Sequence, residues 1–243
     1  MIIKNLIETH CHILPEIDDG ASSLEMSLEM VERLKGQGAE KIIVTPHYYS
    51  DSISLADFVK KRNAAYERLC RALPSDSPEI IPAAEVYISK YLFGNDDLSE
   101  ICAGDTKYAF IEHPFSEDFS DRALERLSSL IIDYGITPVL VHIERYRSLM
   151  DDTDTLDELI DLGCLTQVNI SSFADAHRSI RKKLFKYLES GRISFIGSDC
   201  HNLTTRCPNL GQARQQARAF GAESEFNELR RNAVKLLFPR GNQ

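Results

Sequence analysis

The stretch Ile2-Ile3-Lys4-Asn5-Leu6-Ile7-Glu8-Thr9-His10-Cys11-His12 joins an apolar run to two histidines that are two residues apart. The apolar run is typical of a β-strand. Alternate side chains of an extended chain point to the same side, so the imidazoles of His10 and His12 can both reach one metal ion. Cys11 points to the other side and is expected to pack in the interior. The stretch therefore predicts a strand that ends at a metal site.

Residue types that bind metals recur where later β-rich runs end. Such runs lie at about 2–9, 41–45, 80–88, 107–112, 137–142, 164–170 and 193–197. The residues at or just beyond their ends include His10, His12, His47, Glu85, Glu112, His142, Asp199 and His201. One such residue alone is usually structural, but independent structural causes would have to coincide at run after run. The recurrence predicts a metal centre at one end of a sheet.

Amphipathic, helix-forming segments separate the β-rich runs. They lie at about 22–36, 54–73, 121–134, 153–162, 174–190, 209–220 and 223–237. This alternation predicts an α/β fold with a parallel sheet and right-handed crossovers. Seven strand repeats favour a closed or nearly closed barrel over an open sheet, which stays an alternative. No linker or low-complexity tail divides the chain, so residues 1–243 are expected to form one domain.

Composition excludes several kinds of partner and location. The chain has 243 residues and a net charge of −9, without the Lys/Arg block that a nucleic-acid partner would require. Its six cysteines are scattered and include no CxxC pair, which indicates reduced thiols in the cytoplasm. No secretion signal or long apolar run is present, so no direct membrane insertion is expected.

The donor types and two nearby arginines indicate the chemistry of the site. Active sites of α/β barrels lie at the carboxyl ends of the strands, and mixed imidazole and carboxylate donors suit Zn²⁺, Fe or Mn²⁺. Arg145 and Arg206 follow the last two predicted ligand motifs, and guanidinium groups bind phosphate oxygens. The pattern predicts a phosphomonoester site, with surface salt bridges as the other interpretation of the arginines. His113 is expected to be structural and His177 to be solvated.

The motifs resemble one known superfamily in the same order along the chain. His10-Cys11-His12-Ile13-Leu14-Pro15-Glu16-Ile17-Asp18-Asp19-Gly20 is similar to the opening motif of the PHP (polymerase and histidinol phosphatase) superfamily. The resemblance continues through Thr45-Pro46-His47, Ala84-Glu85-Val86-Tyr87, Ile111-Glu112, His142-Ile143-Glu144-Arg145-Tyr146 and Gly197-Ser198-Asp199-Cys200-His201-Asn202. More narrowly, the chain resembles the manganese-dependent bacterial protein tyrosine phosphatases of capsule and exopolysaccharide operons.

The resemblance implies a distorted seven-stranded (β/α)7 TIM-like barrel that holds three metal ions, with Mn²⁺ expected and Fe, Zn or Mg as alternatives. One ion would be bound by His10, His12, Glu85 and Asp199. Glu85, as a bridge, would bind a second ion with Glu112 and His142. Asp19, His47 and His201 would bind the third. Arg145 and Arg206 would bind the phosphate of the substrate.

The expected reaction is hydrolysis of phosphotyrosine by a metal-bound hydroxide, because bound metals lower the pKa of water. His47, His201 or Asp199 could act as general acid if it is not fully committed to metal. The resemblance implies that the substrate is the tail of a membrane-anchored bacterial tyrosine kinase. The sequence departs from the family's expected pattern at two places. Glu8 stands where the family is expected to carry Asp, and His113-Pro114-Phe115 could reshape the edge of the substrate site.

Three other functions compete with this prediction. Cys200 and Arg206 match the C-x5-R spacing of cysteine-dependent tyrosine phosphatases, but no glycine lies between them and both neighbours of Cys200 resemble metal ligands. A phosphatase for histidinol phosphate or another small molecule could use the same scaffold. A non-catalytic, metal-stabilised module that binds a kinase is a third alternative, and it would be expected to lack a ligand.

Overall fold

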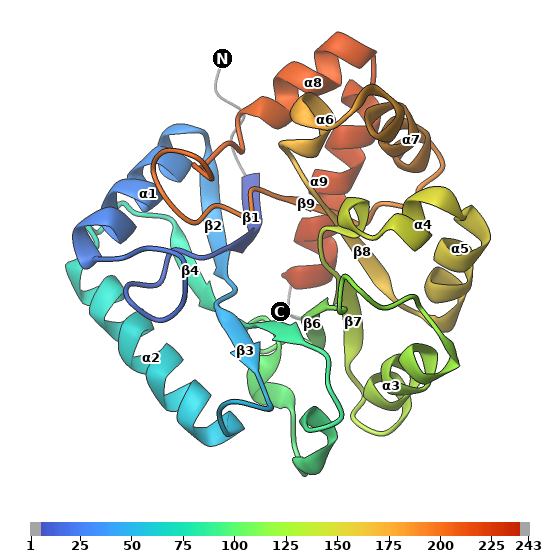
Figure 1. Ribbon diagram of the computed structural model, residues 1–243. Helices are drawn as coiled ribbons and strands as arrows, with labels where there is room; N and C mark the ends of the chain where they lie inside the picture. The colour runs from blue at the N-terminus through green and yellow to red at the C-terminus, as the bar shows by residue number, and fades with distance from the viewer. Residues whose placement is uncertain (1–5, 239–243) are drawn as a thin grey trace, which may run out of the picture.

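The predicted alternation of strands and helices is present in a computed structural model, which describes residues 6–238. Figure 1 shows the strands at the centre of the molecule with helices arranged around them. All pairings between named strands are parallel. The described chain therefore has the predicted α/β class and the predicted strand direction.

The described strands form two sheets. One has the order β1-β2-β4 and contains β1 (Leu6–Cys11), β2 (Ala39–Val44) and β4 (Glu79–Pro82). The other has the order β3-β5-β6-β7-β8-β9 and contains β3 (His47–Tyr49), β5 (Glu85–Tyr87), β6 (Tyr108–Glu112), β7 (Thr137–Leu140), β8 (Leu165–Asn169) and β9 (Phe195–Gly197). The sequence instead predicts seven strands in one sheet.

The difference arises because an unpredicted short strand follows the run 41–45 and because the run 80–88 is interrupted. Pro46 separates β2 from β3, since proline has no N–H to donate to a ladder. The run 80–88 divides at Ala83 and Ala84 into β4 and β5. Hydrogen bonds nevertheless cross the interruption, from Ala83 N to the Val44 carbonyl and from Glu85 N to the Pro46 carbonyl, each at 3.0 Å. Residues 2–5 of the first predicted run lie outside the described residues.

The ends of the first and last strands also lie together. An isolated parallel bridge joins Cys11 to Cys200, just beyond β9. Asp199 N donates to the His10 carbonyl at 2.8 Å, and His12 N donates to the Cys200 carbonyl at 2.9 Å. Two segments that carry predicted ligands are thereby connected through their backbones.

Serine side chains cap the first two predicted helices. The Ser23 hydroxyl accepts from Met26 N at 3.2 Å at the start of α1 (Leu24–Gly36), and the Ser54 hydroxyl accepts from Asp57 N at 3.1 Å before α2 (Leu55–Ala72). The other predicted helices are α3 (Asp121–Ile132), α5 (Thr153–Leu162), α7 (Arg178–Glu189), α8 (Gln212–Phe220) and α9 (Glu223–Leu237). Two short helices were not predicted separately, α4 (Arg147–Asp151) and α6 (Ser172–Asp175).

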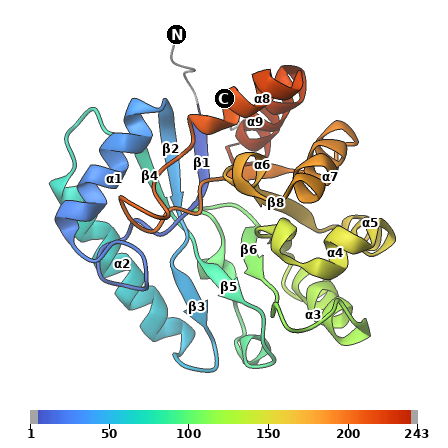
Figure 2. The same ribbon diagram turned by 45° about the horizontal axis from the view of Figure 1, so that its top comes forward.

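A compact apolar cluster lies beneath the strand ends. It contains Ile7, Ile43, Ile81, Phe110, Val139 and Phe195, which come from β1, β2, β4, β6, β7 and β9, together with Ala233 and Leu237 of α9. The Phe110 ring lies 6.3 Å from the His10 ring, so this cluster supports the base of the predicted site. Figure 2 shows α9 next to β1. In the described part of the chain, no helix is long and apolar enough to cross a membrane.

Candidate metal centre

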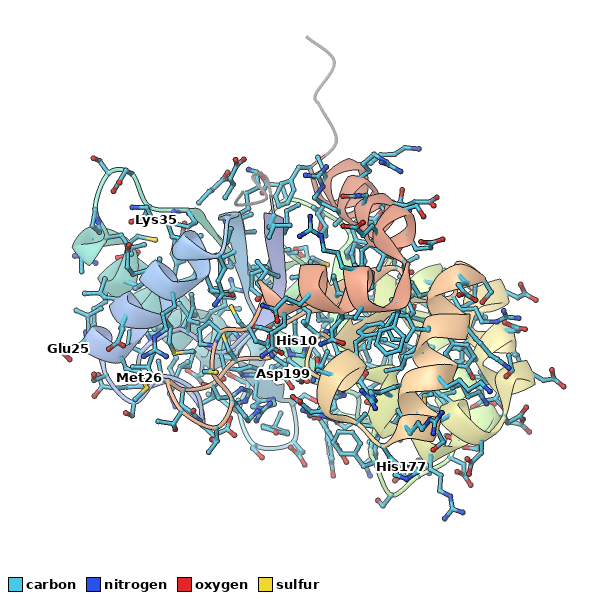
Figure 3. The ribbon with its side chains drawn as sticks, turned by 90° about the horizontal axis from the view of Figure 1, so that it is seen from above. His10, Glu25, Met26, Lys35, His177 and Asp199 are labelled. Carbon is cyan, nitrogen blue, oxygen red and sulfur yellow. The ribbon has the colours of Figure 1, made fainter. Side chains whose placement is uncertain are left out.

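Most of the predicted ligands lie at or beyond the carboxyl ends of strands, and two lie at the start of short strands. His10 lies in β1, Glu112 ends β6, and His47 and Glu85 begin the short strands β3 and β5. The remaining predicted ligands lie in segments that follow β1, β7 and β9: His12, Asp19, His142, Asp199 and His201. In Figure 3 the labelled His10 and Asp199 lie next to each other near the centre of the molecule. Most of these side chains are buried, whereas Asp19 is exposed.

Glu85 occupies the middle of the cluster. Its Oε2 lies 3.2 Å from His10 Nε2 and 3.0 Å from His12 Nε2. The same oxygen is 3.2 Å from His47 Nδ1, and Oε1 is 2.7 Å from His142 Nε2. One carboxylate thus faces four imidazoles, which is the position that a bridging ligand would require.

Asp199 divides its two oxygens between different partners. Oδ1 lies 3.7 Å from His10 Nε2 and 3.5 Å from His12 Nε2. Oδ2 accepts from the guanidinium groups of Arg145 and Arg206, each at 2.7 Å. The carboxylate therefore connects the imidazole cluster to both predicted phosphate-binding arginines.

The remaining predicted ligands lie at two edges of the cluster. Asp19 Oδ1 is 3.4 Å from Nε2 of both His47 and His201. On another side, Glu112 Oε1 is 3.6 Å from His142 Nε2. All nine predicted ligands therefore have at least one other predicted ligand within 4 Å.

Among residues 6–238, three groups of side chains could each hold a metal ion, since their ligand atoms lie within 4.8 Å of one another. They are His12, Asp19, His47 and His201; His10, His12 and Glu85; and His47, Glu85 and Glu112. The first contains the whole set expected for the third ion. The third group combines Glu85 and Glu112 with His47, whereas the sequence prediction combined them with His142.

Hydrogen bonds to the outer ring nitrogens orient the imidazoles. Nδ1 of His12 lies 2.8 Å from Asp18 Oδ2, Nδ1 of His10 lies 3.3 Å from Gln167 Oε1, and Nδ1 of His201 lies 3.0 Å from the Asp199 carbonyl. Donation from Nδ1 leaves the Nε2 lone pair directed into the cluster, as metal-binding histidines require. The two Nε2 atoms of His10 and His12 converge to 3.3 Å, and His201 Nε2 is buried without a hydrogen-bond partner. These donors fit a metal centre.

Burial and neighbouring charges shift the pKa values of the clustered groups. Burial and the Glu85 charge raise the pKa of Glu112 to about 7. Burial and the charge of His12 lower the pKa of His201 to about 4, and burial lowers the pKa of His142. Burial opposes ionisation of Asp199, but His10 and His12 outweigh it and hold its pKa well below the usual range. Burial opposes protonation of His10 and His12, but the neighbouring carboxylates outweigh it and raise the pKa of both imidazoles. Metal binding needs neutral imidazoles and would therefore release protons from this cluster.

Two backbone features hold the ligands in place. His142 and Asp199 have φ values of 37° and 52°, in the left-handed region that non-glycine residues rarely adopt. Such strain often accompanies functional sites. Gly20 is needed for a close approach, because a Cβ there would lie 2.1 Å from the His12 carbonyl oxygen.

A buried polar chain along β8 supports the ligands, and sequence reasoning missed it. Gln167 Oε1 accepts from His142 N at 2.7 Å, and its Nε2 donates to Asn169 Oδ1 at 3.0 Å. Asn169 Nδ2 in turn donates to Asp199 Oδ2 at 2.8 Å. The only sequence signal is the pair of amides at alternate positions of this strand.

The Glu8 departure has a structural role. Its Oε1 accepts from His10 N at 3.1 Å and from Ser198 N at 2.8 Å, so it links the backbones of β1 and the segment after β9. Burial raises the pKa of Glu8 to about 7. Its Oε2 is buried without a hydrogen-bond partner.

The histidines that were predicted to lie outside the site do so. His113 is buried, stacks on Phe119 with ring centroids 4.2 Å apart, and lies 3.1 Å from the Glu117 carbonyl through Nε2. His177 is exposed and caps α7 by accepting from Ser179 N. Figure 3 shows His177 far from His10 and Asp199.

The C-x5-R segment does not form a phosphate-binding loop. Cys200 is fully buried in an apolar cluster that also contains Cys11. The N–H groups of His201 and Asn202 donate to the Arg206 carbonyl, and those of Thr204, Thr205 and Arg206 donate to Asn202 Oδ1. A cysteine-dependent phosphatase needs such N–H groups to surround the phosphate, so this geometry opposes a thiolate mechanism.

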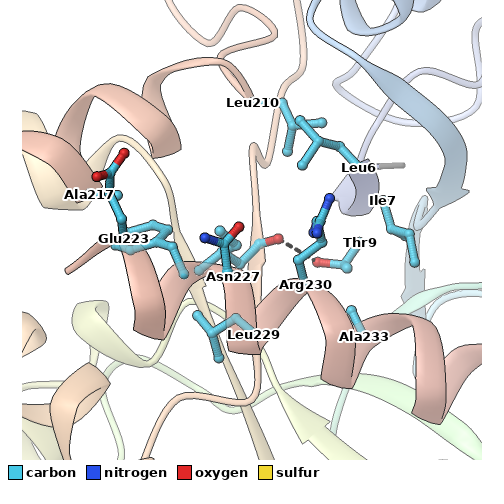
Figure 4. Close-up of a pocket in the computed structure, with 12 residues that line it drawn as sticks. Leu6, Ile7, Thr9, Leu210, Ala217, Glu223, Asn227, Leu229, Arg230 and Ala233 are labelled. Atoms are coloured by element: carbon cyan, nitrogen blue, oxygen red, sulfur yellow. Dashed lines mark hydrogen bonds between the residues drawn. The ribbon is translucent and has the colours of Figure 1, made fainter. Parts of the chain in front are cut away.

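A pocket of about 330 Å³ opens onto the candidate metal centre. It is lined by the predicted site residues His47, Glu85, Glu112, Arg145, Asp199 and Arg206 and by the aromatic residues Tyr49, Tyr87 and Phe115. A second, mainly apolar pocket of about 190 Å³ lies between β1 and α9 (Figure 4). Its lining includes Ile7, Phe226 and Leu229, and none of the predicted ligands is among the described residues that line it.

Parallel strands whose carboxyl ends carry clustered imidazoles and carboxylates define the class of this protein, an α/β protein with a candidate metal centre. The chain belongs to the CpsB/CapC family of capsular polysaccharide synthesis, whose model matches residues 6–238. The resemblance identified from the sequence motifs is thereby confirmed.

Individual relatives match almost the whole chain. The tyrosine-protein phosphatase CpsB of Streptococcus agalactiae serotype III (strain NEM316) is 31% identical over 240 residues, which cover 96% of this chain and 98% of the relative. The tyrosine-protein phosphatase YwqE of Bacillus subtilis (strain 168) is 32% identical, with 96% and 91% covered.

Solved structures show the same fold. One solved structure comes from the work on YwqE of Bacillus subtilis and CpsB of Streptococcus pneumoniae, described as unique metal-dependent tyrosine phosphatases. It superposes on this chain with a TM-score of 0.81 at 28% identity. It covers 96% of this chain and 94% of the solved one. An amidohydrolase from Mycoplasma synoviae, at 10% identity and a TM-score of 0.57, covers 96% of this chain and 87% of its own and shares the fold alone.

Proposed function

We propose that this protein is a metal-dependent protein tyrosine phosphatase. The observation that carries the proposal is the pocket in which two arginines bind one oxygen of Asp199 while the other oxygen faces the imidazoles of His10 and His12. Cations placed beside a metal centre suit a dianionic phosphate ester. The relatives named tyrosine-protein phosphatase support the same activity.

The metal ligands are assigned from the sequence prediction. His10, His12, Glu85 and Asp199 would hold one ion, Glu85, Glu112 and His142 a second, and Asp19, His47 and His201 a third. The grouping of ligand atoms supports the third set in full, whereas it joins His10, His12 and Glu85 without Asp199, and Glu85 and Glu112 with His47 and not with His142. We assign Mn²⁺ as the resident ion, because the resemblance to manganese-dependent phosphatases implies it and because the four carboxylates among the nine donors suit harder cations. Bound ions would act as Lewis acids and lower the pKa of water.

The residues around the pocket bind the phosphate of the substrate and can supply a proton to the leaving oxygen. Arg145 and Arg206 turn from Asp199 toward the phosphate oxygens and neutralise charge as the ester bond breaks. Of the assigned general acids His47, His201 and Asp199, only His47 is partly exposed. His47 is therefore the best placed of the three to protonate the leaving oxygen, a role open to it only while it is not bound to a metal ion. A phenolate needs little such help.

We further propose a single barrel domain, a kinase substrate and a cytoplasmic location for the whole chain. Counting β2 with β3 and β4 with β5 gives the seven strands of a distorted TIM-like barrel in one domain, 1–243, and the Cys11–Cys200 bridge supports closure. Phosphotyrosine on the tail of a membrane-anchored bacterial tyrosine kinase is the proposed substrate. The free cysteines support a cytoplasmic location, because cytoplasmic thiols stay reduced.

Metal removal and restoration test the proposal. Hydrolysis of a phosphotyrosine peptide by the full chain should cease after chelation and return when Mn²⁺ is added. His12→Ala should lower both the bound metal, measured by elemental analysis, and the activity, whereas the surface control His177→Ala should change neither. Full activity of the metal-free protein would refute the metal-dependent mechanism. Preferential hydrolysis of histidinol phosphate would favour the small-molecule alternative.

A further inference from the structure

The pocket beside the candidate metal centre has two chemically different sides. The arginines come from segments after β7 and β9, whereas the aromatic side chains come from β3, β5 and the segment after β6. The aromatic residues are Tyr49, Tyr87 and Phe115. Charge and aromatic surface therefore approach the same cavity from different strands.

Phe115 is exposed but held in place. Its side chain is 52% exposed, yet its ring stacks on the buried Tyr146 with centroids 5.2 Å apart and an interplanar angle of 23°. Tyr146 is itself fixed, because its hydroxyl accepts from His113 N at 2.9 Å. The Phe115 ring thus presents a supported aromatic surface to the pocket.

Tyr49 contributes a second exposed ring. It is 39% exposed, and its centroid lies 5.7 Å from that of Tyr87 and 5.5 Å from that of His47. The Tyr49 ring therefore contacts both the predicted ligand His47 and the Tyr87 ring where it lines the pocket.

Aromatic surface left exposed loses the stabilisation that burial would provide, and its grouping around a pocket indicates a ligand that covers it. Aromatic pairs gain affinity beyond buried area, equivalent to about 2- to 10-fold in binding. The rings of Phe115 and Tyr49 are not needed to hold the phosphate. They would instead contact the organic group that is esterified to it.

We propose that Phe115 and Tyr49 are specificity-determining residues that contact the ring of an aryl phosphate, so that the pocket selects phosphotyrosine over alkyl phosphates. The proposal rests on the phosphatase function proposed above. Arg145 and Arg206 receive the phosphate end of the substrate, and the two aromatic residues contact its phenyl ring. Phe115 and Tyr49, and not the metal ligands, then distinguish phosphotyrosine from phosphoserine.

Matched peptides that carry phosphotyrosine or phosphoserine test this assignment in the Mn²⁺-loaded protein. Phe115→Ala and Tyr49→Ala should each lower kcat/KM for the phosphotyrosine peptide about 2- to 10-fold, mainly by raising KM. Activity on the phosphoserine peptide should stay unchanged. Phe115→Tyr should retain selectivity, and Tyr91→Ala, which removes an exposed tyrosine outside the pocket, is the control. Equal effects on both peptides, or no effect, would overturn the assignment.

A binding measurement separates this assignment from the proposed activity. The chain has no tryptophan, so Phe115→Trp introduces a single indole at the rim. A non-hydrolysable aryl phosphonate should change its fluorescence at lower concentration than an alkyl phosphonate, whereas Tyr91→Trp should not respond. Absence of phosphatase activity in the wild type would refute the proposed function. Equal fluorescence responses to both phosphonates would refute the aromatic contact.

Discussion

Individual polar side chains at the centre serve as links between neighbours. Asp199 Oδ2 accepts from Arg145, Arg206 and Asn169, so one oxygen joins the arginines to the amide chain of β8. Asp18, beside the predicted Asp19, accepts from His12 Nδ1 and from His47 N. Burial opposes ionisation of Asp18, but the His12 hydrogen bond outweighs it and lowers its pKa to about 2. Residues that touch ligands are therefore as important to the geometry as the ligands.

Glu144 should make the stability of the fold depend on pH. Burial raises its pKa to about 7 from 4.5, although its Oε1 accepts from Asn169 N and the Ser172 hydroxyl. A raised carboxyl pKa stabilises the fold below pH 4.5, and this stability is lost as the pH rises through 7. Glu144→Gln should therefore raise the free energy of unfolding of metal-free protein at pH 8 by on the order of 3 kcal/mol. At pH 4.5 it should have little effect.

Urea unfolding of both proteins in the presence of a chelator, at the two pH values, measures this difference. The variant Glu158→Gln, on the surface of α5, provides a control for the loss of a charge. A Glu144→Gln effect of equal size at both pH values would contradict the raised pKa.

Cys200 should not act as the catalytic nucleophile. Its thiol is fully buried against Cys11, and the adjacent backbone N–H groups already have acceptors. Cys200→Ser should retain most of kcat/KM for a phosphotyrosine peptide. Loss of an essential nucleophile would instead lower the rate about a millionfold. Steady-state kinetics, with Cys207→Ser as a control, distinguish these outcomes.

At the scale of elements, β1 and β9 must approach closely to assemble the centre. The Thr9 hydroxyl donates to the Ile196 carbonyl at 3.0 Å, drawn as a dashed line in Figure 4. Gly197 lies directly against His10, where a Cβ would come within 2.8 Å of His10 Cβ and 3.0 Å of its backbone nitrogen. The small residue in β9 thus permits the backbone contact that places Asp199 beside His10.

Gly197→Ala should destabilise the protein and displace His10. Overpacking of this kind costs about 1–3 kcal/mol. Urea unfolding should show the loss, and titration of metal-free protein with Mn²⁺ should show weaker binding. Gly36→Ala is the matched control, because nothing lies within 4 Å of a Cβ at that helix position. Unchanged metal binding in Gly197→Ala would show that His10 does not depend on this contact.

At the scale of the whole molecule, the centre joins segments from both sheets. β1 belongs to the first sheet, and β3, β5, β6, β7 and β9 belong to the second. A ligand that binds the folded state but not the unfolded chain stabilises the fold in proportion to its occupancy. Binding at this centre should therefore stabilise the entire fold.

Mn²⁺ should raise the midpoint of thermal unfolding of the chelator-treated protein. A concentration 100 times the dissociation constant corresponds to about 2.7 kcal/mol for one site. Differential scanning calorimetry across a Mn²⁺ series measures the shift, and His12→Ala should reduce it while His177→Ala should not. A midpoint that is independent of Mn²⁺ would show that these residues do not form a metal centre in the folded protein.

The sequence by itself determined the class of fold and which residues meet. The alternation of apolar runs with capped amphipathic segments requires parallel strands, and parallel strands bring His10, Glu112 and Asp199 to one edge. The tertiary structure alone decided how strands are interrupted, and which buried groups orient the ligands. Gln167 and Asn169 contact residues 25 to 157 positions away. Such hydrogen bonds depend on register and backbone conformation, including the left-handed Asp199, which no local pattern specifies.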